Sequence, residues 1–326
     1  MNPSSAYRRF ALLSLVSLAV GWHALVATFA LALGNDAYTH IFLILPISVA
    51  LIASEWRLRH AQPEPNFRAG SALLVLAVLL GFIAGGWRRF GSLTADMQIS
   101  VGMLALVTWW IGAFLCCFGT RIARMFVFPL GFLLWLVPVP ELALNHTVAF
   151  LQRGSASAAH LLFSVARVPV AQDGVVLSLP GITLEVAKEC SSIRSSMMLL
   201  ITGMVLAHLL LRTSWGKALA MLAIIPLCIA KNGLRVFVLA MLGLYVDPGY
   251  LQGRLHHDGG IVFFLVALAG LCVLLWLIAG TERRTEVQPD VSRRMSTLAT
   301  PQRLPATKAT KAQRDRIKIV DGRSSC

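Results

Sequence analysis

The chain has 326 residues, of which 57% are hydrophobic and 13% are charged. Soluble globular domains carry about 25% charged residues, so the composition argues against a soluble protein, and the long apolar runs indicate an integral membrane protein. The net charge is +14. Because the basic residues lie between the apolar runs and in the C-terminal tail, we interpret them as determinants of membrane topology, with no nucleic acid as partner.

Eight apolar runs are candidates for membrane-spanning helices, judged against the roughly 20 helical residues that cross a bilayer core. They are residues 10–34, 40–54, 71–87, 100–119, 126–139, 191–211, 218–246 and 260–280. Two runs are short, and 218–246 is long enough to be a helix broken at Pro226 and Gly233. The predicted fold is therefore all-α, a polytopic transmembrane helical bundle of about eight spans that occupies residues 1–280.

Residues 140–190 form the longest segment between predicted spans. Apolar residues recur at helical spacing over 142–168, which predicts an interfacial helix. Residues 174–187 are rich in β-branched side chains on both sides of Pro180-Gly181, which predicts a β-hairpin with a Pro-Gly turn. We expect a small extracytoplasmic insertion made of this helix and hairpin.

The distribution of Lys and Arg predicts the orientation of the bundle. With the N-terminus inside, the segments richest in Lys and Arg face the cytoplasm, as the positive-inside rule requires, and Arg88 and Arg89 are the exception. Eight spans return the basic segment 281–326 to the same side. Its polar composition predicts a disordered cytoplasmic tail, in a multi-pass protein of the cytoplasmic membrane.

Six cysteines show neither a CxxC pair nor a Cys/His spacing typical of metal sites. We therefore expect no metal, no cofactor and no disulfide framework. Four of the six lie inside apolar runs and one lies in the tail, which leaves Cys190 at the start of a predicted span.

Three polar clusters lie within or beside predicted spans, where polar side chains are costly and are functional candidates. They are residues 189–196, 231–235 and 256–260. The predicted topology brings all three to the outer face of the membrane.

The residue types in these clusters suit acyl transfer by a thiol. Cys190 and Arg194 are four residues apart, so they share one helical face, and a helix N-terminus together with a neighbouring Arg favours the thiolate. His256 could carry the proton, and Arg235 could stabilise an oxyanion or bind a carboxylate. Each also has a structural reading: Arg194 could extend to the interface, and Asn232 could bridge helices.

The order of these blocks resembles the exosortase/archaeosortase family. The matching residues are Cys190-Ser-Ser-Ile-Arg194-Ser, then Asn232-Gly-Leu-Arg235, then His256 before Gly260 and Phe264. Ser192 stands where the family commonly has Gly, and His257 directly follows His256, so the identity of the proton carrier stays open.

The resemblance implies a membrane cysteine protease or transpeptidase with a thioester acyl-enzyme. Cys190, Arg235 and His256 would be catalytic, and Arg194, Asn232 and His257 would contact the substrate. The implied partners are exported proteins whose C-terminal sorting signal joins a recognition motif (Pro-Glu-Pro in the bacterial class), a hydrophobic helix and a basic cluster. The site would lie on the periplasmic side.

Two other functions fit parts of the sequence. A non-enzymatic transporter or assembly factor for exopolysaccharide export would use Arg235 and a broken seventh helix to line a pathway. A membrane O-acyltransferase or glycan-modifying enzyme would use His257 as a base, which leaves Cys190 and Arg194 without a role.

Overall fold

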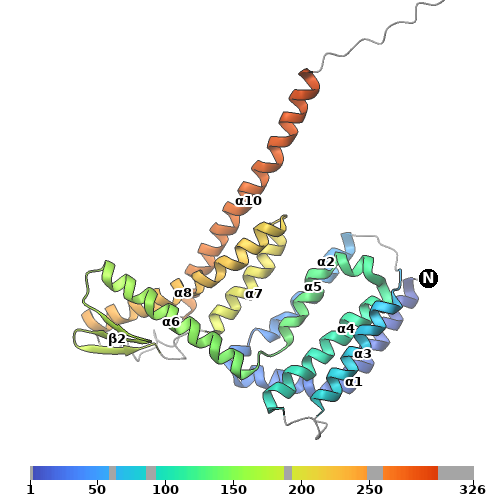
Figure 1. The fold of residues 1–326 in the computed structure, drawn as a ribbon, viewed down its shortest axis with the longest axis horizontal. Helices are drawn as coiled ribbons and strands as arrows, with labels where there is room; N and C mark the ends of the chain where they lie inside the picture. Colours follow the sequence, from blue (N-terminus) through green and yellow to red (C-terminus); the bar gives the residue numbers. More distant parts are fainter. Residues whose placement is uncertain (1–2, 59–63, 86–92, 187–192, 248–259, 300–326) are drawn as a thin grey trace, which may run out of the picture. The chain divides into compact units, whose positions relative to one another are not determined.

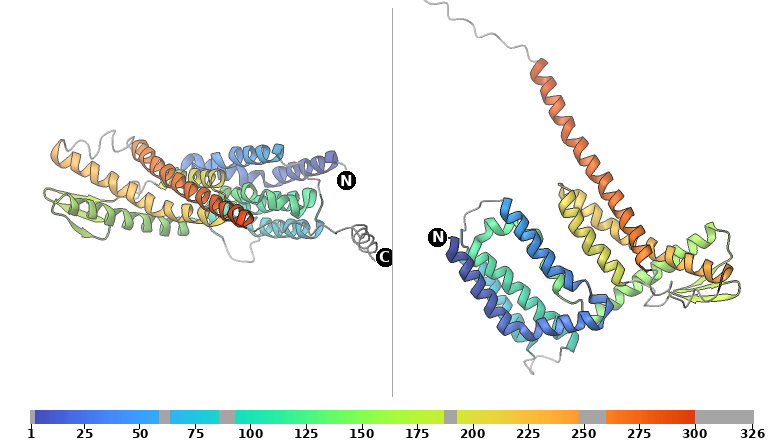
Figure 2. Two further views of the ribbon diagram at one scale, coloured as in Figure 1. Left: turned by 90° about the horizontal axis from the view of Figure 1, so that it is seen from above. Right: turned by 180° about the vertical axis from the view of Figure 1, so that it is seen from behind.

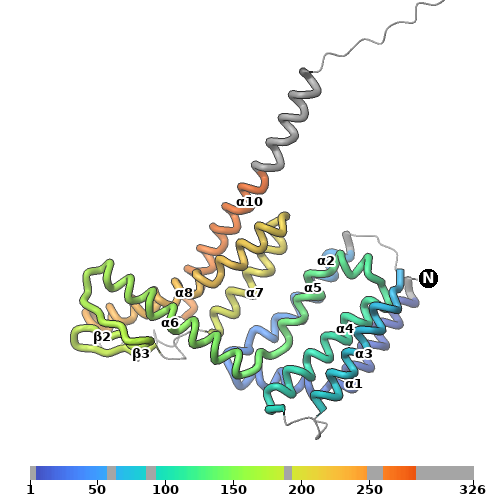
Figure 3. Tube along the Cα trace, in the orientation of Figure 1, coloured from blue at the N-terminus to red at the C-terminus, as the bar shows by residue number. Residues whose placement is uncertain are grey.

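The computed structural model describes residues 3–58, 64–85, 93–186, 193–247 and 260–299 (Figures 1 and 3). The chain divides into two compact units, Met1–Ala279 and Gly280–Cys326, whose boundary falls inside the last helix. The helices in chain order are α1 (Pro3–Gly34), η1 (Asp36–Tyr38), α2 (Ile41–Leu58), α3 (Phe67–Ala84), α4 (Ala95–Met125), α5 (Val127–Phe132), η2 (Leu133–Leu136), α6 (Glu141–Val165), α7 (Ile193–Leu210), α8 (Ser214–Tyr245) and α10 (Gly260–Ala299).

The predicted membrane bundle is confirmed. In the described part of the chain, seven helices are long and apolar enough to cross a membrane, and an eighth span is possible if one bent pair is counted. The second span reaches from Asp36 to Trp56, so it is longer than the expected 40–54. Many large apolar side chains on α1, α3 and α10 are exposed, as expected for surfaces that face lipid.

Aromatic side chains fill the core between the N-terminal helices. Phe118 of α4 lies at the centre of this cluster, with ring centroids 5.2 Å from Trp56 of α2, 5.5 Å from Tyr7 of α1 and 4.8 Å from Phe114. The core continues through Phe126 and Phe132 to Leu136, all of them buried. Close aromatic packing of this kind holds helices together in lipid, where the hydrophobic effect between helices is weak.

A break in α4 coincides with the predicted end of the fourth span. Gly119 has φ +85°, a left-handed conformation that favours glycine, and a Cβ there would lie 1.6 Å from the carbonyl oxygen of Glu64. The helix resumes beyond this residue and ends at Met125.

The expected span at 126–139 is not one straight helix. Val127–Leu136 is about 15 Å long, half the thickness of a bilayer core, and meets Glu141–Val165 at 98°. Pro138 and Pro140 lie at the bend, where a missing N–H and a fixed φ oppose helix continuation. The pair is a broken span or a re-entrant segment.

The predicted hairpin is present and forms part of a three-stranded antiparallel sheet. Strand β1 (Ala171–Asp173) pairs with β2 (Val176–Leu179), which pairs with β3 (Ile182–Glu185). Gly181 has φ +91° in the turn after Pro180, as a type II turn requires. Leu177 and Leu179 pack on Phe163 of α6, so the sheet covers one face of that helix.

Helices α7 and α8 form a tight antiparallel hairpin. Thr213 caps α8 by accepting a hydrogen bond from Gly216 N at 3.0 Å. The expectation that Pro226 and Gly233 break α8 is wrong, because α8 is one helix of 32 residues with Pro226 inside it. Neighbouring helices compensate for one lost backbone hydrogen bond in such a span.

Helix α10 continues past the predicted domain boundary. A disordered segment was expected from residue 281, but the helix runs from Gly260 to Ala299. Its part within the first unit packs on α7 and α8 through Ala267, Leu271 and Leu275. Residues 300–326 lie outside the described residues.

Candidate functional site

The α7–α8 hairpin fixes which parts of the two helices are neighbours. Gly203 lies opposite Ile224, whose Cδ1 would be 2.7 Å from an added Cβ, and Cys228 Sγ lies 4.0 Å from the carbonyl oxygen of Ser196. The first turn of α7 therefore packs beside residues 228–231 of α8. The remaining part of α8, from Asn232 to Tyr245, extends about 21 Å beyond the start of α7.

Lys231 joins the first and second predicted clusters directly. Its Nζ donates hydrogen bonds to Ser195 Oγ and, at 3.4 Å, to Ser196 Oγ in the first turn of α7. The side chain is only 5% exposed. Two sequence blocks about 35 residues apart thus meet where α7 begins.

The other polar residues of the second cluster are buried in the same part of α8. Asn232 is fully buried and Arg235 is 7% exposed. Arg235 lies one helical turn beyond Lys231, so the two cationic side chains share one face, close enough for their charges to interact.

Two glycines, Gly154 of α6 and Gly233 of α8, let these helices approach each other closely near Asn232. A Cβ on Gly233 would lie 2.5 Å from Ala158 Cβ, and a Cβ on Gly154 would lie 2.9 Å from Ile229 Cδ1. Small residues on both helices therefore let α6 and α8 run side by side (Figure 2). The predicted break at Gly233 is in fact a packing contact that encloses the segment carrying Asn232 and Arg235.

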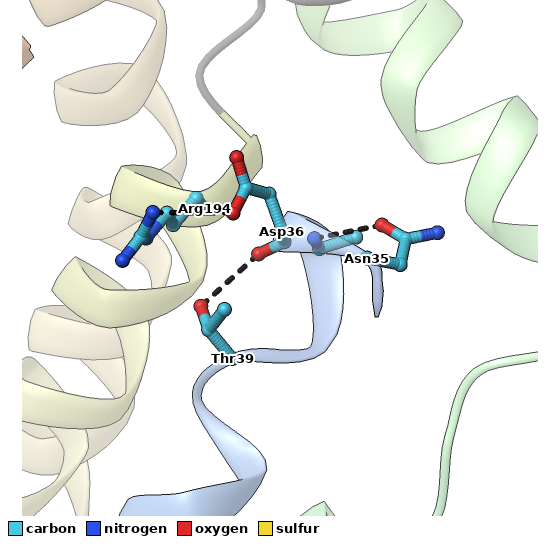
Figure 4. Close-up of polar contacts among 5 residues, drawn as sticks. Asn35, Asp36, Thr39 and Arg194 are labelled. Carbon is cyan, nitrogen blue, oxygen red and sulfur yellow. Dashed lines mark hydrogen bonds and ion pairs between the residues drawn. The ribbon is translucent and has the colours of Figure 1, made fainter. Parts of the chain in front are cut away.

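Arg194 lies in the first turn of α7, beside Ser195, but its partner belongs to η1 and not to α8. Its Nη1 lies 3.1 Å from Asp36 Oδ1 of η1, the short helix between α1 and α2 (Figure 4). Asn35 caps η1 by accepting from Ala37 N, and Thr39 Oγ1 donates to the carbonyl oxygen of Asp36. Both charged side chains are more than half exposed, so the ion pair is a surface link between the N-terminal helices and the candidate site.

The start of α10 faces the same end of the hairpin. A Cβ added at Gly270 would lie 3.7 Å from Leu227 Cδ1, and Leu271 lies beside Gly203. Phe264 packs on the cluster shared by α7, α8 and α10. His256 and His257 precede Gly260, the first residue of α10, by four and three positions.

Three predicted site residues fall outside the described part of the chain. They are Cys190, His256 and His257. Cys190 precedes Ile193, the first residue of α7, by three positions. The described residues bring Lys231 against Ser195 and Ser196 and bury Asn232 and Arg235 nearby, whereas the guanidinium of Arg194 is held by Asp36.

Sequence analysis missed the roles of two described residues. Lys231 was part of a cluster without an assigned task, although a lysine inside an apolar run is itself a signal. Asp36 gave no comparable signal, because an acid directly after a span is ordinary. Among the described residues, no group of three or more His, Cys, Asp or Glu could hold a metal ion.

Fold and site together define a polytopic helical membrane protein with polar and cationic residues at one end of its α7–α8–α10 cluster. The family model of the transmembrane exosortases (Exosortase_EpsH) matches residues 22–273. The match covers most of the chain, and the chain therefore belongs to the transmembrane exosortase family. No curated protein and no solved structure matched it.

Proposed function

We propose that this protein is a cysteine protease or transpeptidase that cleaves C-terminal sorting signals of exported proteins. The observation that carries the proposal is the contact of Lys231 with Ser195 and Ser196. It joins the Cys-containing block to the Asn-x-x-Arg block at the start of α7. Family membership supports the same reading, because this order of blocks resembles the exosortase pattern.

In the proposed reaction, the Cys190 thiolate attacks the carbonyl carbon of the scissile peptide. The C–N bond then breaks, and His256 gives a proton to the departing amine. The acyl group stays on sulfur as a thioester. Water or an acceptor amine attacks the thioester, loses its proton to His256, and releases the thiolate.

Arg235 is the proposed stabiliser of the oxyanion that forms in both steps. Its burial supports this role, because a cation acts more strongly on a developing negative charge where water is excluded. Arg194, Asn232 and His257 are proposed to contact the substrate, whose C-terminal helix lies in the same bilayer. For Arg194, the ion pair with Asp36 would limit the directions in which the guanidinium can point.

The proposed location is the periplasmic face of the cytoplasmic membrane. It follows from the positive-inside reading of the Lys and Arg residues. In spheroplasts, a membrane-impermeant maleimide should label Cys190 from outside. Labelling of Cys190 only after the membrane is permeabilised would contradict this orientation.

The deciding experiment is Cys190→Ala, with Cys272→Ala as its matched control because Cys272 is an exposed thiol on α10. The substrate is a secreted reporter that ends in a Pro-Glu-Pro motif, an apolar helix and a basic cluster. We expect wild type and Cys272→Ala to release the shortened reporter and Cys190→Ala to release none, by mass spectrometry of the mature C-terminus. Equal release by Cys190→Ala would favour a transport or assembly role instead.

A further inference from the structure

Lys231 and Ser195 are close enough for a proton to pass between them. Lys231 Nζ is hydrogen-bonded to Ser195 Oγ, across the contact between α8 and the first turn of α7. A hydroxyl and an amine in direct contact are the two groups of a Ser–Lys dyad, in which the amine takes the hydroxyl proton as the oxygen attacks a carbonyl carbon. The described residues therefore contain a nucleophile and a base that the proposed reaction of Cys190 does not use.

The surroundings of Lys231 match those of lysines that act as bases in enzymes. Its side chain is 5% exposed, in a helix long and apolar enough to cross a membrane. Among the described residues no carboxylate forms an ion pair with it, and the positive charge of Arg235 is near enough to repel it. Burial and a neighbouring cation are the conditions under which a lysine serves in catalysis. Because a buried ammonium costs free energy, a lysine at this position indicates a chemical task.

Ser196 provides the contact that would orient the amine. Its Oγ lies 3.4 Å from Lys231 Nζ and accepts a hydrogen bond from it. A neutral amine has N–H donors and one lone pair, so a donor directed at Ser196 leaves the lone pair for the hydroxyl of Ser195. Ser196 is 5% exposed, whereas Ser195 is only partly buried. The base and the group that orients it are inside the protein, and the nucleophile is the member that a substrate could reach.

Positive charge is available for the oxyanion that attack on a carbonyl would form. Arg235 follows Lys231 by one helical turn on the same face of α8 and is 7% exposed. The start of α7, which carries Ser195, adds the partial positive charge of its first backbone N–H groups. The nucleophile, the base and these positive charges thus belong to the first turn of α7 and the part of α8 beside it.

We propose that Ser195 and Lys231 form a second acyl-transfer site, with Ser195 as the nucleophile and Lys231 as the general base. Its substrate class is an ester or amide whose carbonyl carbon can reach Ser195 Oγ. The inference goes beyond the proposed function, because it requires no reaction at Cys190.

The proposed reaction has two steps. In the first, Ser195 Oγ bonds to the carbonyl carbon and its proton moves to Lys231 Nζ. The bond to the leaving group then breaks, and the leaving group takes that proton. In the second step, water attacks the acyl-serine and gives a proton to Nζ. The ester bond breaks, Nζ returns the proton to Ser195 Oγ, and the acid is released.

A fluorophosphonate probe tests the dyad without a natural substrate. Ser195 Oγ would bond to its phosphorus and fluoride would leave, while the hydroxyl proton moves to Lys231 Nζ. Full-length protein in detergent is treated with the probe, and mass spectrometry measures the rate at which the Ser195 peptide is modified. We expect labelling of wild type at Ser195. Lys217→Met, at the other end of α8, is the matched control and should be labelled at the wild-type rate.

Two variants of Lys231 separate a base from a structural cation. Lys231→Arg keeps the positive charge but cannot accept a proton, and Lys231→Gln keeps a hydrogen-bond donor for the two serines without charge. We expect both to be labelled at least tenfold more slowly than wild type, because Ser195 has lost its base. Scanning fluorimetry in detergent checks that each variant is folded. The slow labelling of either variant with a wild-type Tm assigns the loss to the base.

The dyad is overturned if wild type is not labelled at Ser195, or if Lys231→Arg or Lys231→Gln is labelled within twofold of wild type. Its failure is separate from that of the proposed function. Reporter release by Cys190→Ala would contradict the proposed function whatever the labelling of Ser195 is. Loss of release in Cys190→Ala, with no label at Ser195 in wild type, would remove only the dyad.

Discussion

The N-terminal helices α1–α5 and the later helices α6–α8 have interiors of different kinds. The N-terminal interior is aromatic, and its buried Ser17 and Ser100 donate to backbone carbonyls nearby. Both buried Lys and Arg side chains of the described residues, Lys231 and Arg235, lie in α8. The first interior also buries the side chains of Thr28, His40 and Ser48 but no described lysine or arginine, whereas the second holds two such cations. If the proposed function is correct, the N-terminal helices would serve as a scaffold and the chemistry would belong to the later helices.

The largest expected effect comes from removing a cation from α8. Arg235→Met should lower the rate of reporter processing at least 100-fold, a loss of about 2.7 kcal/mol of transition-state stabilisation, because the oxyanion loses its charged partner. Pulse–chase of the reporter measures the rate. Arg121→Met, an exposed arginine of α4, should process normally. A fall of less than threefold for Arg235→Met would remove the distinction between the two halves.

The aromatic core should show the opposite pattern, a loss of stability without a loss of chemistry. Phe118→Ala leaves a cavity among Tyr7, Trp56 and Phe114 and should cost about 3 kcal/mol of unfolding free energy. Scanning fluorimetry in detergent should show a lower Tm, while processing per folded molecule stays normal. Phe82→Ala, on an exposed side chain of α3, is the control. A wild-type Tm together with lost processing would argue against a scaffold role.

A smaller effect is expected at the contact between α6 and α8. Gly233→Ala places a methyl group 2.5 Å from Ala158 Cβ and should destabilise the protein by about 1–2 kcal/mol. Gly81→Ala in α3 has no atom within 4 Å of the added methyl and should instead raise stability by up to about 1 kcal/mol. Opposite shifts in Tm would establish the tight packing of α8. Shifts of the same sign would show that helix propensity outweighs the contact.

The smallest effect is expected at the exposed ion pair between η1 and α7, one of several contacts that join the two groups of helices. A double-mutant cycle of Asp36→Asn and Arg194→Gln should give a coupling energy of about 0.2–1 kcal/mol, because both side chains are largely exposed. Thermal unfolding of the four proteins measures it. A coupling above about 2 kcal/mol would mean that this pair links the two groups of helices more strongly than exposed charges usually do.

The elements that were predicted correctly are those whose sequence pattern lies within one short stretch of the chain. The apolar run near 191–211 becomes α7, and Pro180-Gly181 forms the turn between β2 and β3. The bend between η2 and α6 falls where the sequence separates the short run at 126–139 from the helix expected over 142–168, and Pro138 and Pro140 lie at this boundary.

The candidate site was predicted only in part, for a physical reason. Burial of Asn232 and Arg235 follows from their place inside an apolar run. The partners of Lys231 and Arg194 depend on how distant helices pack, which no local pattern records. Gly233 shows the same limit, since sequence suggested a break where the structure has a close helix contact.

The unequal lengths of α7 and α8 make the depth of the site sensitive to bilayer thickness. With 18 residues, α7 is about 27 Å long, slightly less than a typical hydrocarbon core. In a thin bilayer, Ser195 and Lys231 would meet the headgroups, whereas longer acyl chains would surround Arg235 with hydrocarbon or force the helices to change their tilt. Lipid chain length should therefore change the surroundings of these side chains without any substitution in the protein.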